Sequence, residues 1–403
     1  MTSSDSRPLR VAMVLDSWDD TNNGAVVSTR RFSELLRQRG HDVTVLATGR
    51  PEPGKVTLRQ FRVPLADGIM RKMRFPFAWP DRRILEEAFS RQDVVHVQFP
   101  FWLGIRAVKL AGEAGLPVVS TFHVQAEHLL HNVGIRNQAM VHGVYRLFLR
   151  TVYDRSDRVI CPSAFAEREL RRHGLRAPTA VISNGLPPQY HPIPRSAWPD
   201  LGGKFTILSV GRLAREKRHD LLVEAIRRSR HEPRIQLVVI GDGPLRRRLE
   251  EQARLLTNAP RFLYLKPHEL IPYYNAVDLD VHAAEVEVEC MSVLEAMGCG
   301  APCLIARSPL SATSQFAISD RFLFESGSRD ELTAKIDWFV EHPEELREAR
   351  ARSRQVAEAY RIEASLEKLI AVYGEVARGR GVTRPAAAPA APAGGATATP
   401  AAP

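Results

Sequence analysis

The chain has 403 residues, of which 44% are hydrophobic, and a net charge of +10 that favours anionic partners such as phosphates or acidic lipid surfaces. Its four cysteines are too few and too irregularly spaced for a disulfide framework, and the absence of RNP aromatics and zinc-finger spacing argues against a nucleic-acid partner. No stretch approaches the ~18 apolar residues of a membrane span, so we expect two or three ordinary globular domains in the cytoplasm.

The first half of the chain alternates between short apolar runs and amphipathic stretches. The predicted strands are 9–15, 42–46, 94–97, 118–121, 159–161 and 180–183. The predicted helices between them are 26–39, 105–114 and 138–154. Repeated units of this βαβ kind predict a parallel sheet that carries helices on its faces.

The second half repeats this rhythm after a proline-rich linker at 188–203. The predicted strands are 205–210, 236–240, 280–282 and 302–305, and the predicted helices are 219–228, 244–255, 268–276 and 292–297. Two similar α/β halves, 9–187 and 204–360, predict a ligand cleft between them, outside the carboxyl ends of the strands. An amphipathic helix is expected at 361–378, and the ends 1–8 and 379–403 are expected to be disordered.

A glycine and two cations, Gly211, Arg212 and Lys217, follow the first strand of the second half. Backbone N–H groups at the entry of the next helix attract an anion, and fixed cations neutralise its charge, so this turn is suited to a diphosphate. A solvated basic loop has the same composition, since Arg215 and Arg218 are also nearby. The spacing alone leaves both interpretations open.

A second turn, Gly241-Asp-Gly-Pro244, ends the following strand and opens a helix. It is not the dinucleotide-binding G-x-G-x-x-G, because Pro244 and Arg246 break that pattern. A tight turn with proline at the first helical position explains this segment well.

Two glutamates stand eight residues apart, Glu287 in the loop after a predicted strand and Glu295 in the next helix. Apolar neighbours bury that helix, so Glu295 points toward the strand ends, where a carboxylate can accept both hydroxyls of a ribose. Glu287 can reach the hydroxyls of a sugar. Glu285 and Glu289 flank Glu287, however, and acidic loops are common.

In their order and spacing these segments resemble family 4 of the GT-B glycosyltransferases, the large retaining group. The segments that carry the resemblance are Gly211 to Lys217, Gly241 to Pro244, Glu287 to Pro302, Asn184-Gly185 and Thr121-Phe-His123. The resemblance covers about Arg10 to Ala377. It implies an α/β fold of two Rossmann-like domains with a cleft between them, an acceptor domain at 9–187 and a donor domain at 204–360. It also implies that the last helix returns to the N-terminal domain.

The resemblance further implies a site built from both halves. Arg212 and Lys217 match the pair that holds the donor diphosphate, Glu295 the ribose ligand, and Glu287 and His123 the residues that face the transferred sugar. The implied catalytic residues are thus Arg212, Lys217, Glu287 and His123. The implied donor-binding residues are Gly24, Gly211, Arg212, Lys217, Gly241, Glu287, Cys290, Met291, Ser292 and Glu295. No metal and no cofactor is expected beyond the nucleotide sugar itself, a UDP- or GDP-hexose.

Three departures from the family pattern leave the base and the sugar of the donor open. Val288-Glu289-Cys290 stands where Gly-Phe-Gly is usual, 309–315 replaces a Gly-Gly turn, and Tyr264 replaces a glycine. The expected mechanism is front-face displacement with retention, in which the leaving diphosphate, stabilised by Arg212 and Lys217, helps to accept the acceptor proton.

Two other groups of residues suggest metal binding, but less well. Asp278-Leu-Asp280 resembles a D-x-D motif yet leads into a predicted buried strand. His123, Glu127, His128 and His131 do not follow the order of a zinc-protease helix. We therefore expect no metal site in either group.

The acceptor is the least defined partner. Residues 69–79 interleave bulky apolar residues with three cations, a pattern suited to a peripheral contact with anionic lipid or, equally, to a loop inside the domain. If the segment binds membrane, the protein lies on its inner face and glucose or mannose goes to a lipid in glycolipid or cell-envelope synthesis. The alternatives are a soluble saccharide or small-molecule acceptor, a GT-B sugar-nucleotide epimerase, and a non-catalytic nucleotide-sugar sensor.

Overall fold

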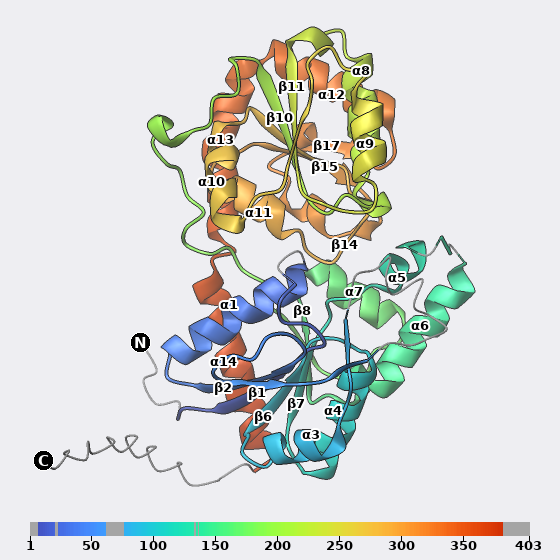
Figure 1. Ribbon diagram of the computed structural model, residues 1–403, viewed down its shortest axis with the longest axis vertical. Helices are drawn as coiled ribbons and strands as arrows, with labels where there is room; N and C mark the ends of the chain where they lie inside the picture. The colour runs from blue at the N-terminus through green and yellow to red at the C-terminus, as the bar shows by residue number, and fades with distance from the viewer. Residues whose placement is uncertain (1–6, 21–22, 62–75, 133, 136, 382–403) are drawn as a thin grey trace, which may run out of the picture.

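The computed structural model describes residues 7–20, 23–61, 76–132, 134–135 and 137–381, and these form two α/β halves stacked along the long axis of the molecule (Figure 1). Most of the segment predicted to touch a membrane (69–75) and most of the two ends predicted to be disordered (1–6 and 382–403) lie outside the described residues. Within the described residues, no helix combines the length and the apolar character that crossing a membrane would require.

The N-terminal half is built on a seven-stranded parallel sheet of order β3-β2-β1-β6-β7-β8-β9. Its strands are β1 (Arg10–Val14), β2 (Asp42–Ala47), β3 (Lys55–Thr57), β6 (Val94–Val97), β7 (Val118–Thr121), β8 (Arg158–Cys161) and β9 (Thr179–Val181). The helices are α1 (Gly24–Gln38), α3 (Arg82–Phe89), α4 (Trp102–Glu113), α5 (Ala126–Asn132), α6 (Gln138–Thr151) and α7 (Ala164–Arg172). A short antiparallel pair, β4 (Gln60–Phe61) and β5 (Phe77–Ala78), lies apart from the sheet.

The C-terminal half has a six-stranded parallel sheet of order β12-β11-β10-β13-β15-β17. Its strands are β10 (Phe205–Val210), β11 (Ile235–Ile240), β12 (Arg261–Leu263), β13 (Leu279–His282), β15 (Cys303–Arg307) and β17 (Leu323–Glu325). The helices are α8 (His219–Arg228), α9 (Arg246–Ala253), α10 (Pro267–Ala276), α11 (Met291–Gly298), α12 (Arg329–Glu341) and α13 (Pro343–Glu358). A short parallel ladder joins β14 (Val286–Glu287) to β16 (Leu310–Ser311).

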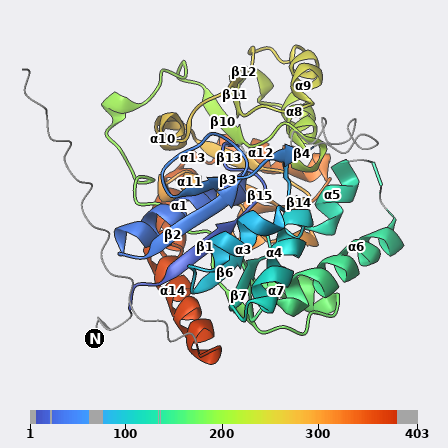
Figure 2. The same cartoon turned by 60° about the horizontal axis from the view of Figure 1, so that its bottom comes forward.

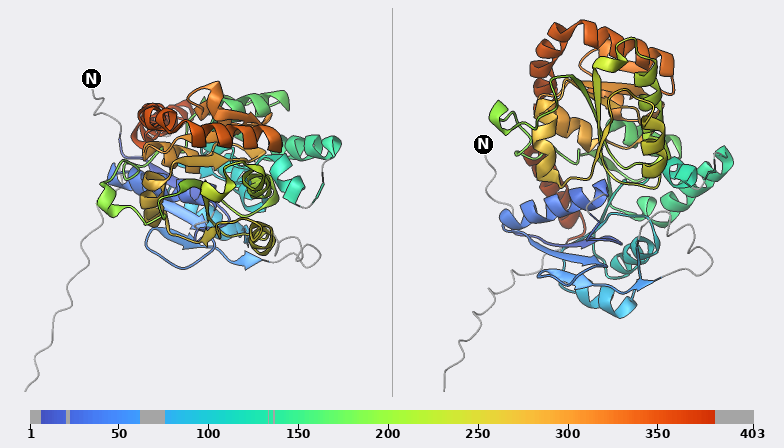
Figure 3. Two further views of the ribbon diagram at one scale, coloured as in Figure 1. Left: turned by 90° about the horizontal axis from the view of Figure 1, so that it is seen from above. Right: turned by 45° about the horizontal axis from the view of Figure 1, so that its top comes forward.

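The apolar runs of the sequence become strands that are buried on both faces, as parallel sheets require. β11, for example, is buried at every residue. The sheets divide the hydrophobic core into clusters on either face. The right-hand view of Figure 3 shows the C-terminal half above the N-terminal half. This confirms the predicted fold, two Rossmann-like halves, and every predicted strand and helix overlaps an observed one. The exact domain boundaries stay a prediction.

The last helix, α14 (Ile362–Gly379), packs on the N-terminal half, as predicted (Figure 2). Its apolar face buries Leu366, Leu369 and Tyr373 in the cluster that also contains residues of β1 and β2. The chain therefore passes between the halves twice, and the two passages bond to each other: Leu186 N–H donates to Tyr360 O at 2.7 Å, and Ile362 N–H donates to Leu186 O at 3.1 Å. At this crossing a side chain on Gly185 would come within 2.6 Å of Ile362, so only glycine fits.

Candidate active site

A cavity of about 560 Å³ lies between the halves and takes its walls from both. The N-terminal half supplies Gly24 at the start of α1 together with residues after β6 and β7. The C-terminal half supplies the turns after β10 and β11 and the segment 287–292. We call this cavity the main pocket. Because both sheets are parallel, it lies where their carboxyl ends face each other, which is the position predicted from sequence.

The main pocket contains a buried ion pair between Lys217 and Glu287. Lys217 Nζ donates to Glu287 Oε1, and the two side chains are 16% and 14% exposed. Burial opposes the charged forms, but the pairing outweighs it: the pKa of Lys217 is raised, and Lys217 together with His282 lowers the pKa of Glu287 to about 2. The sequence predicts Glu287 in the loop that follows a strand. It lies instead in β14, where the ladder to β16 fixes its backbone.

Arg212 also lines the main pocket, on the turn after β10, and it has no ion pair within the described part of the chain. Close by, α11 begins at Met291 without a side-chain cap from Cys290, so its first N–H groups are unsatisfied by the helix itself. Met291, Ser292 and Cys290 all line the pocket. A free guanidinium, a buried ammonium and a helix N-terminus converge here, and together they make an anion-binding wall.

The two glycine-containing turns of the C-terminal half pack directly on each other. Gly211 N–H donates to Ile240 O at 3.0 Å, and Leu213 N–H donates to Asp242 O at 3.0 Å. A Cβ on Gly241, whose φ is +151°, would lie 1.9 Å from Gly211 O. Gly211 lines the main pocket and Gly241 does not, although Asp242 does. The packing of the two turns therefore requires glycine at position 241, whether or not a ligand binds.

Glu295 lies outside the set of residues that line the main pocket. Its Oε1 accepts a hydrogen bond from Arg31 Nη2 of α1 at 2.9 Å, so the pair joins the C-terminal half to the N-terminal half. Burial opposes the charge on Arg31, but Glu295 keeps the arginine pKa raised. Sequence reasoning did not identify Arg31. The ribose-binding role of Glu295 stays a prediction, and a ribose there would share the carboxylate with Arg31.

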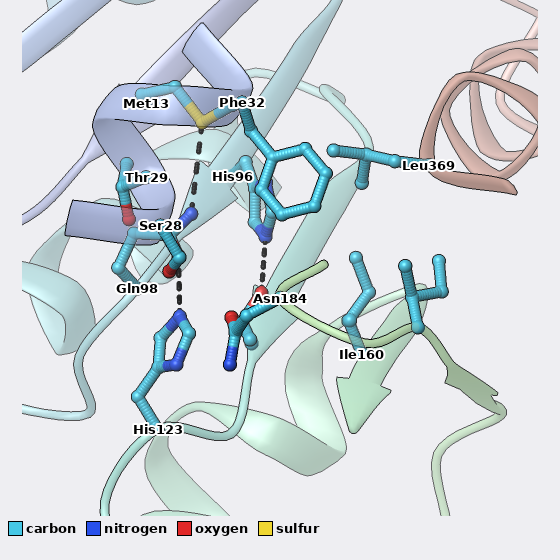
Figure 4. A pocket seen from close by; sticks show the side chains of 12 residues that line it. Met13, Ser28, Thr29, Phe32, His96, Gln98, His123, Ile160, Asn184 and Leu369 are labelled. Atoms are coloured by element: carbon cyan, nitrogen blue, oxygen red, sulfur yellow. Dashed lines mark hydrogen bonds between the residues drawn. The ribbon is translucent and has the colours of Figure 1, made fainter. Parts of the chain in front are cut away.

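His123 lies at the boundary of the main pocket and a smaller inner cavity of about 20 Å³ (Figure 4). Burial lowers the pKa of His123 to about 3, so the ring is neutral near pH 7. Its Nε2–H donates to Gln98 Oε1 at 3.1 Å, which leaves Nδ1 as a hydrogen-bond acceptor. A neutral imidazole with so low a pKa is suited to orienting a hydroxyl rather than to general-base catalysis.

The inner cavity lies between α1, the sheet and α14, with Met13, Phe32 and Leu369 among its apolar walls (Figure 4). At its floor His96 bonds to Tyr373 of α14 at 2.6 Å and to Thr121 at 2.7 Å. The volume suits one water molecule rather than a sugar. The returning helix α14 is thereby bonded to strands directly beneath the predicted site.

The unusual loop 288–290 is tied to the N-terminal half. Glu289 Oε2 accepts from Asn184 N at 2.8 Å and from Asn184 Nδ2 at 2.7 Å, while Ser163 Oγ donates to Val288 O at 2.7 Å. Burial raises the pKa of Glu289 to about 7. Where the family pattern has glycines, this chain therefore uses side chains that bond across the two halves. The sequence marked the departure but did not indicate its partners.

Two groups of side chains in the described residues place three ligand-type atoms within 4.8 Å of one another, and each could hold a metal ion. They are His282, Glu287 and Cys290, and Glu127, Glu169 and His173. In the first, the ammonium of Lys217 already pairs with Glu287 and would repel a cation. None of the three residues of the second group lines the main pocket. Asp278 of the D-x-D sequence accepts from Thr206 N at 2.8 Å and does not line the pocket, so its role is structural.

Comparison with known proteins agrees with this geometry. Residues 22–190 match the family described as Glycosyltransferase Family 4, and residues 195–356 match Glycosyl transferases group 1. The chain is 28% identical over 354 residues to a GDP-mannose-dependent alpha-mannosyltransferase of Corynebacterium glutamicum, covering 83% of this chain and 81% of that protein. It is 27% identical over 328 residues to alpha-monoglucosyldiacylglycerol synthase of Streptococcus pneumoniae, covering 75% and 72%. The solved structure of Anabaena HepE with UDP and glucose has the same fold, with a TM-score of 0.72 over 91% of this chain and 100% of that chain at 17% identity.

Proposed function

The chain belongs to family 4 of the GT-B glycosyltransferases and is a hexosyltransferase, and from this premise we propose its substrates and the roles of its residues. The proposed reaction moves glucose or mannose from a UDP- or GDP-sugar to a hydroxyl of a membrane lipid, with retention of anomeric configuration and without a metal. The observation that carries the proposal is the ionised Lys217–Glu287 pair in the main pocket, beside Arg212.

In this proposal the anion-binding wall holds the donor diphosphate. Arg212, Lys217 and the first N–H groups of α11 stabilise the negative charge that develops on the leaving phosphate. The bond from the acceptor oxygen to the anomeric carbon forms on the face from which the diphosphate leaves, and a phosphate oxygen takes the acceptor proton. Glu287 accepts hydrogen bonds from hydroxyls of the sugar. His123 Nδ1 accepts a hydrogen bond from another hydroxyl, on the side of the N-terminal half. Catalysis then rests on positioning and charge stabilisation.

A lipid acceptor is supported by the relative named alpha-monoglucosyldiacylglycerol synthase, and by the charge of +10, which favours an anionic surface. We propose that residues 69–79 contribute to this contact. Trp79, which belongs to the described part of this segment (76–79), is 49% exposed, as a membrane-interface tryptophan would be. A peripheral position on the inner face of the membrane follows.

The test combines donor binding with transfer. A thermal-shift panel of UDP, GDP and their glucose and mannose derivatives names the donor, because a ligand of the native state raises Tm. Radiolabelled transfer from that donor is then measured into vesicles that contain diacylglycerol, phosphoinositide or polyprenyl phosphate, and in parallel into a soluble saccharide. Label that appears only in a soluble saccharide acceptor refutes the lipid proposal. Release of nucleotide diphosphate at full rate with no acceptor present would instead favour an epimerase.

A further inference from the structure

Two buried carboxylates and one imidazole lie together in the N-terminal half, outside the main pocket. Glu127 belongs to α5, Glu169 belongs to α7, and His173 caps the C-terminal end of α7. Glu127 and Glu169 are only 3% and 6% exposed. Each of the three residues places one ligand-type atom within 4.8 Å of those of the other two. We call these three residues the Glu–Glu–His group.

The two carboxylates of the group have few cationic partners. Glu127 Oε2 accepts from the hydroxyl of Tyr145 at 2.9 Å, and Glu127 makes no ion pair within the described residues. Glu169 Oε1 lies 3.0 Å from His173 Nε2, and Arg172, whose side chain is 75% exposed, reaches Glu169 only at 4.0 Å. Buried carboxylates are ordinarily paired with cations or coordinate metals. A divalent ion between these ligand atoms would supply the charge that the neighbouring side chains do not.

The contacts around the group hold its side chains in place. His173 Nδ1 lies 2.9 Å from His142 Nδ1, and the other ring nitrogen, Nε2, points toward Glu169. Tyr145 bonds to Glu127 and also stacks on His173, with ring centroids 3.8 Å apart. In metal sites the ligating imidazole typically bonds through its second nitrogen, and the ligating carboxylates accept further hydrogen bonds. Both features are present here.

An open hollow of about 440 Å³ gives access to the group. It is lined by Ala139, His142, Arg146 and His173, so one ligand of the group borders solvent while the two carboxylates stay buried. Zinc is often held by three protein ligands and a water molecule in the fourth position. Such a water could occupy the hollow.

We propose that Glu127, Glu169 and His173 bind a zinc ion that joins α5 to α7. The imidazole favours zinc over magnesium or calcium, which prefer ligand sets made of oxygen atoms. Zinc takes the lone pair of His173 Nε2, so the proton between this nitrogen and Glu169 passes to solvent. The ion takes no part in sugar transfer, and the proposal does not rest on the proposed function.

The ion would still affect the main pocket through α5. His128 and Leu129, which follow Glu127 in this helix, both line the main pocket, and His128 Nε2 lies 3.6 Å from Glu216 of the C-terminal half. A zinc ion bound to Glu127 would hold this short helix to α7 and so fix that part of the pocket wall.

The test titrates the full chain with zinc chloride by calorimetry, after treatment with a chelator and dialysis. We expect one zinc ion per native chain, with release of protons that makes the heat depend on the buffer. In Glu169→Gln and His173→Gln the affinity should fall more than ~100-fold. Tyr145→Phe removes only the hydroxyl that supports Glu127 and should weaken binding about 10-fold, the scale of losing a contact to a ligand.

Two control variants locate the ion. His231→Gln removes an imidazole that lies 2.7 Å from Glu341 Oε1, but this pair belongs to no group of three ligands among the described residues. Cys290→Ala tests the other such group, which contains a sulfur ligand. Both variants should bind zinc as the native chain does. Cobalt in place of zinc should give no sulfur-to-metal charge-transfer band, because the proposed ligands are nitrogen and oxygen.

Melting curves give a second measurement. Zinc should raise the Tm of the native chain and of His231→Gln but not that of His173→Gln, and the curves without zinc verify that each variant is folded. The proposal is overturned if the native chain binds no zinc, if Glu169→Gln and His173→Gln bind it unchanged, if Cys290→Ala loses it, or if magnesium competes equally. None of these measurements requires sugar transfer, so a failure of the proposed function would be seen separately.

Discussion

Replacement of Lys217 by alanine tests the centre of the proposed site. The side chain of Glu287 is 14% exposed, so the variant leaves a buried carboxylate without its main partner. In the native protein the pairing lowers the pKa of Glu287 from 4.5 to about 2, an interval that corresponds to about 3 kcal/mol. His282 still approaches Glu287 at 3.3 Å and retains part of this stabilisation. We therefore expect Lys217→Ala to lose about 2 kcal/mol of unfolding free energy at pH 7.

The same variant changes how stability depends on pH. A depressed native pKa gives stability that is present above the unfolded value of 4.5 and is lost as pH falls toward 2. Without Lys217, burial brings the pKa of Glu287 back up toward its unfolded value, so this residue contributes less stability at neutral pH than it does in the native protein. The difference in unfolding free energy between native protein and variant should accordingly be largest above pH 5 and shrink toward pH 3.

The assay pairs urea unfolding at several pH values with initial rates of sugar transfer. Turnover of Lys217→Ala should fall more than ~10²-fold, the scale of removing one preorganised electrostatic donor. Arg218→Gln is the matched control, since it breaks the neighbouring ion pair with Glu285, whose side chains are 25% and 26% exposed, and neither residue lines the pocket. That control should lose no more than ~1 kcal/mol. Near-normal turnover in Lys217→Ala, or a pH profile parallel to that of the native protein, would refute the reasoning.

Three further variants probe the remaining residues. Arg212→Ala should lower turnover more than ~10²-fold, because it removes a cation from the anion-binding wall. Its Tm should stay unchanged, since Arg212 has no ion pair in the described part of the chain. Rates and melting curves measured on the same protein test both expectations. Glu295→Gln should weaken nucleotide binding by about 10-fold in calorimetry, and an unchanged Kd with a lowered Tm would instead assign the carboxylate to Arg31 alone. Because the pKa of Glu289 is raised to about 7, this residue contributes stability below pH 4.5 that is lost as pH rises through 7. Glu289→Gln should therefore remove that pH dependence from urea unfolding curves measured between pH 5 and 8. A profile unchanged from that of the native protein would contradict the prediction.

The sequence predicted the repeating βα elements because each carries its own apolar period and its own turn residues. It predicted nothing between 306 and 361, where β17, α12 and α13 lie, and it missed short strands such as β12. β17 and β12 have three residues each, too few for alternation to be visible. Their place in the sheet is set by pairing with β15 and β11, which no local pattern records.

The site residues also differ in whether a local sequence pattern reveals them. Arg212, Lys217 and Glu287 could be singled out because each belongs to a motif with a recognisable spacing. Arg31 and the contact of Glu289 with Asn184 could not, since these pairs join residues 264 and 105 positions apart through side-chain geometry alone. Even Lys217 and Glu287 are 70 positions apart, and only the parallel order β10-β13 brings their turns together.

Several contacts between the halves involve the segment that is predicted to hold the donor. Arg31 reaches Glu295, Asn184 reaches Glu289, and Ser163 reaches Val288, so the N-terminal half contacts the segment 288–295 at three points. A ligand that bonds to this segment must share some of those contacts, because Arg31 already donates to one of the two oxygens of Glu295. The affinity for the donor and the relative position of the halves therefore draw on the same interactions, and a change in one must appear in the other.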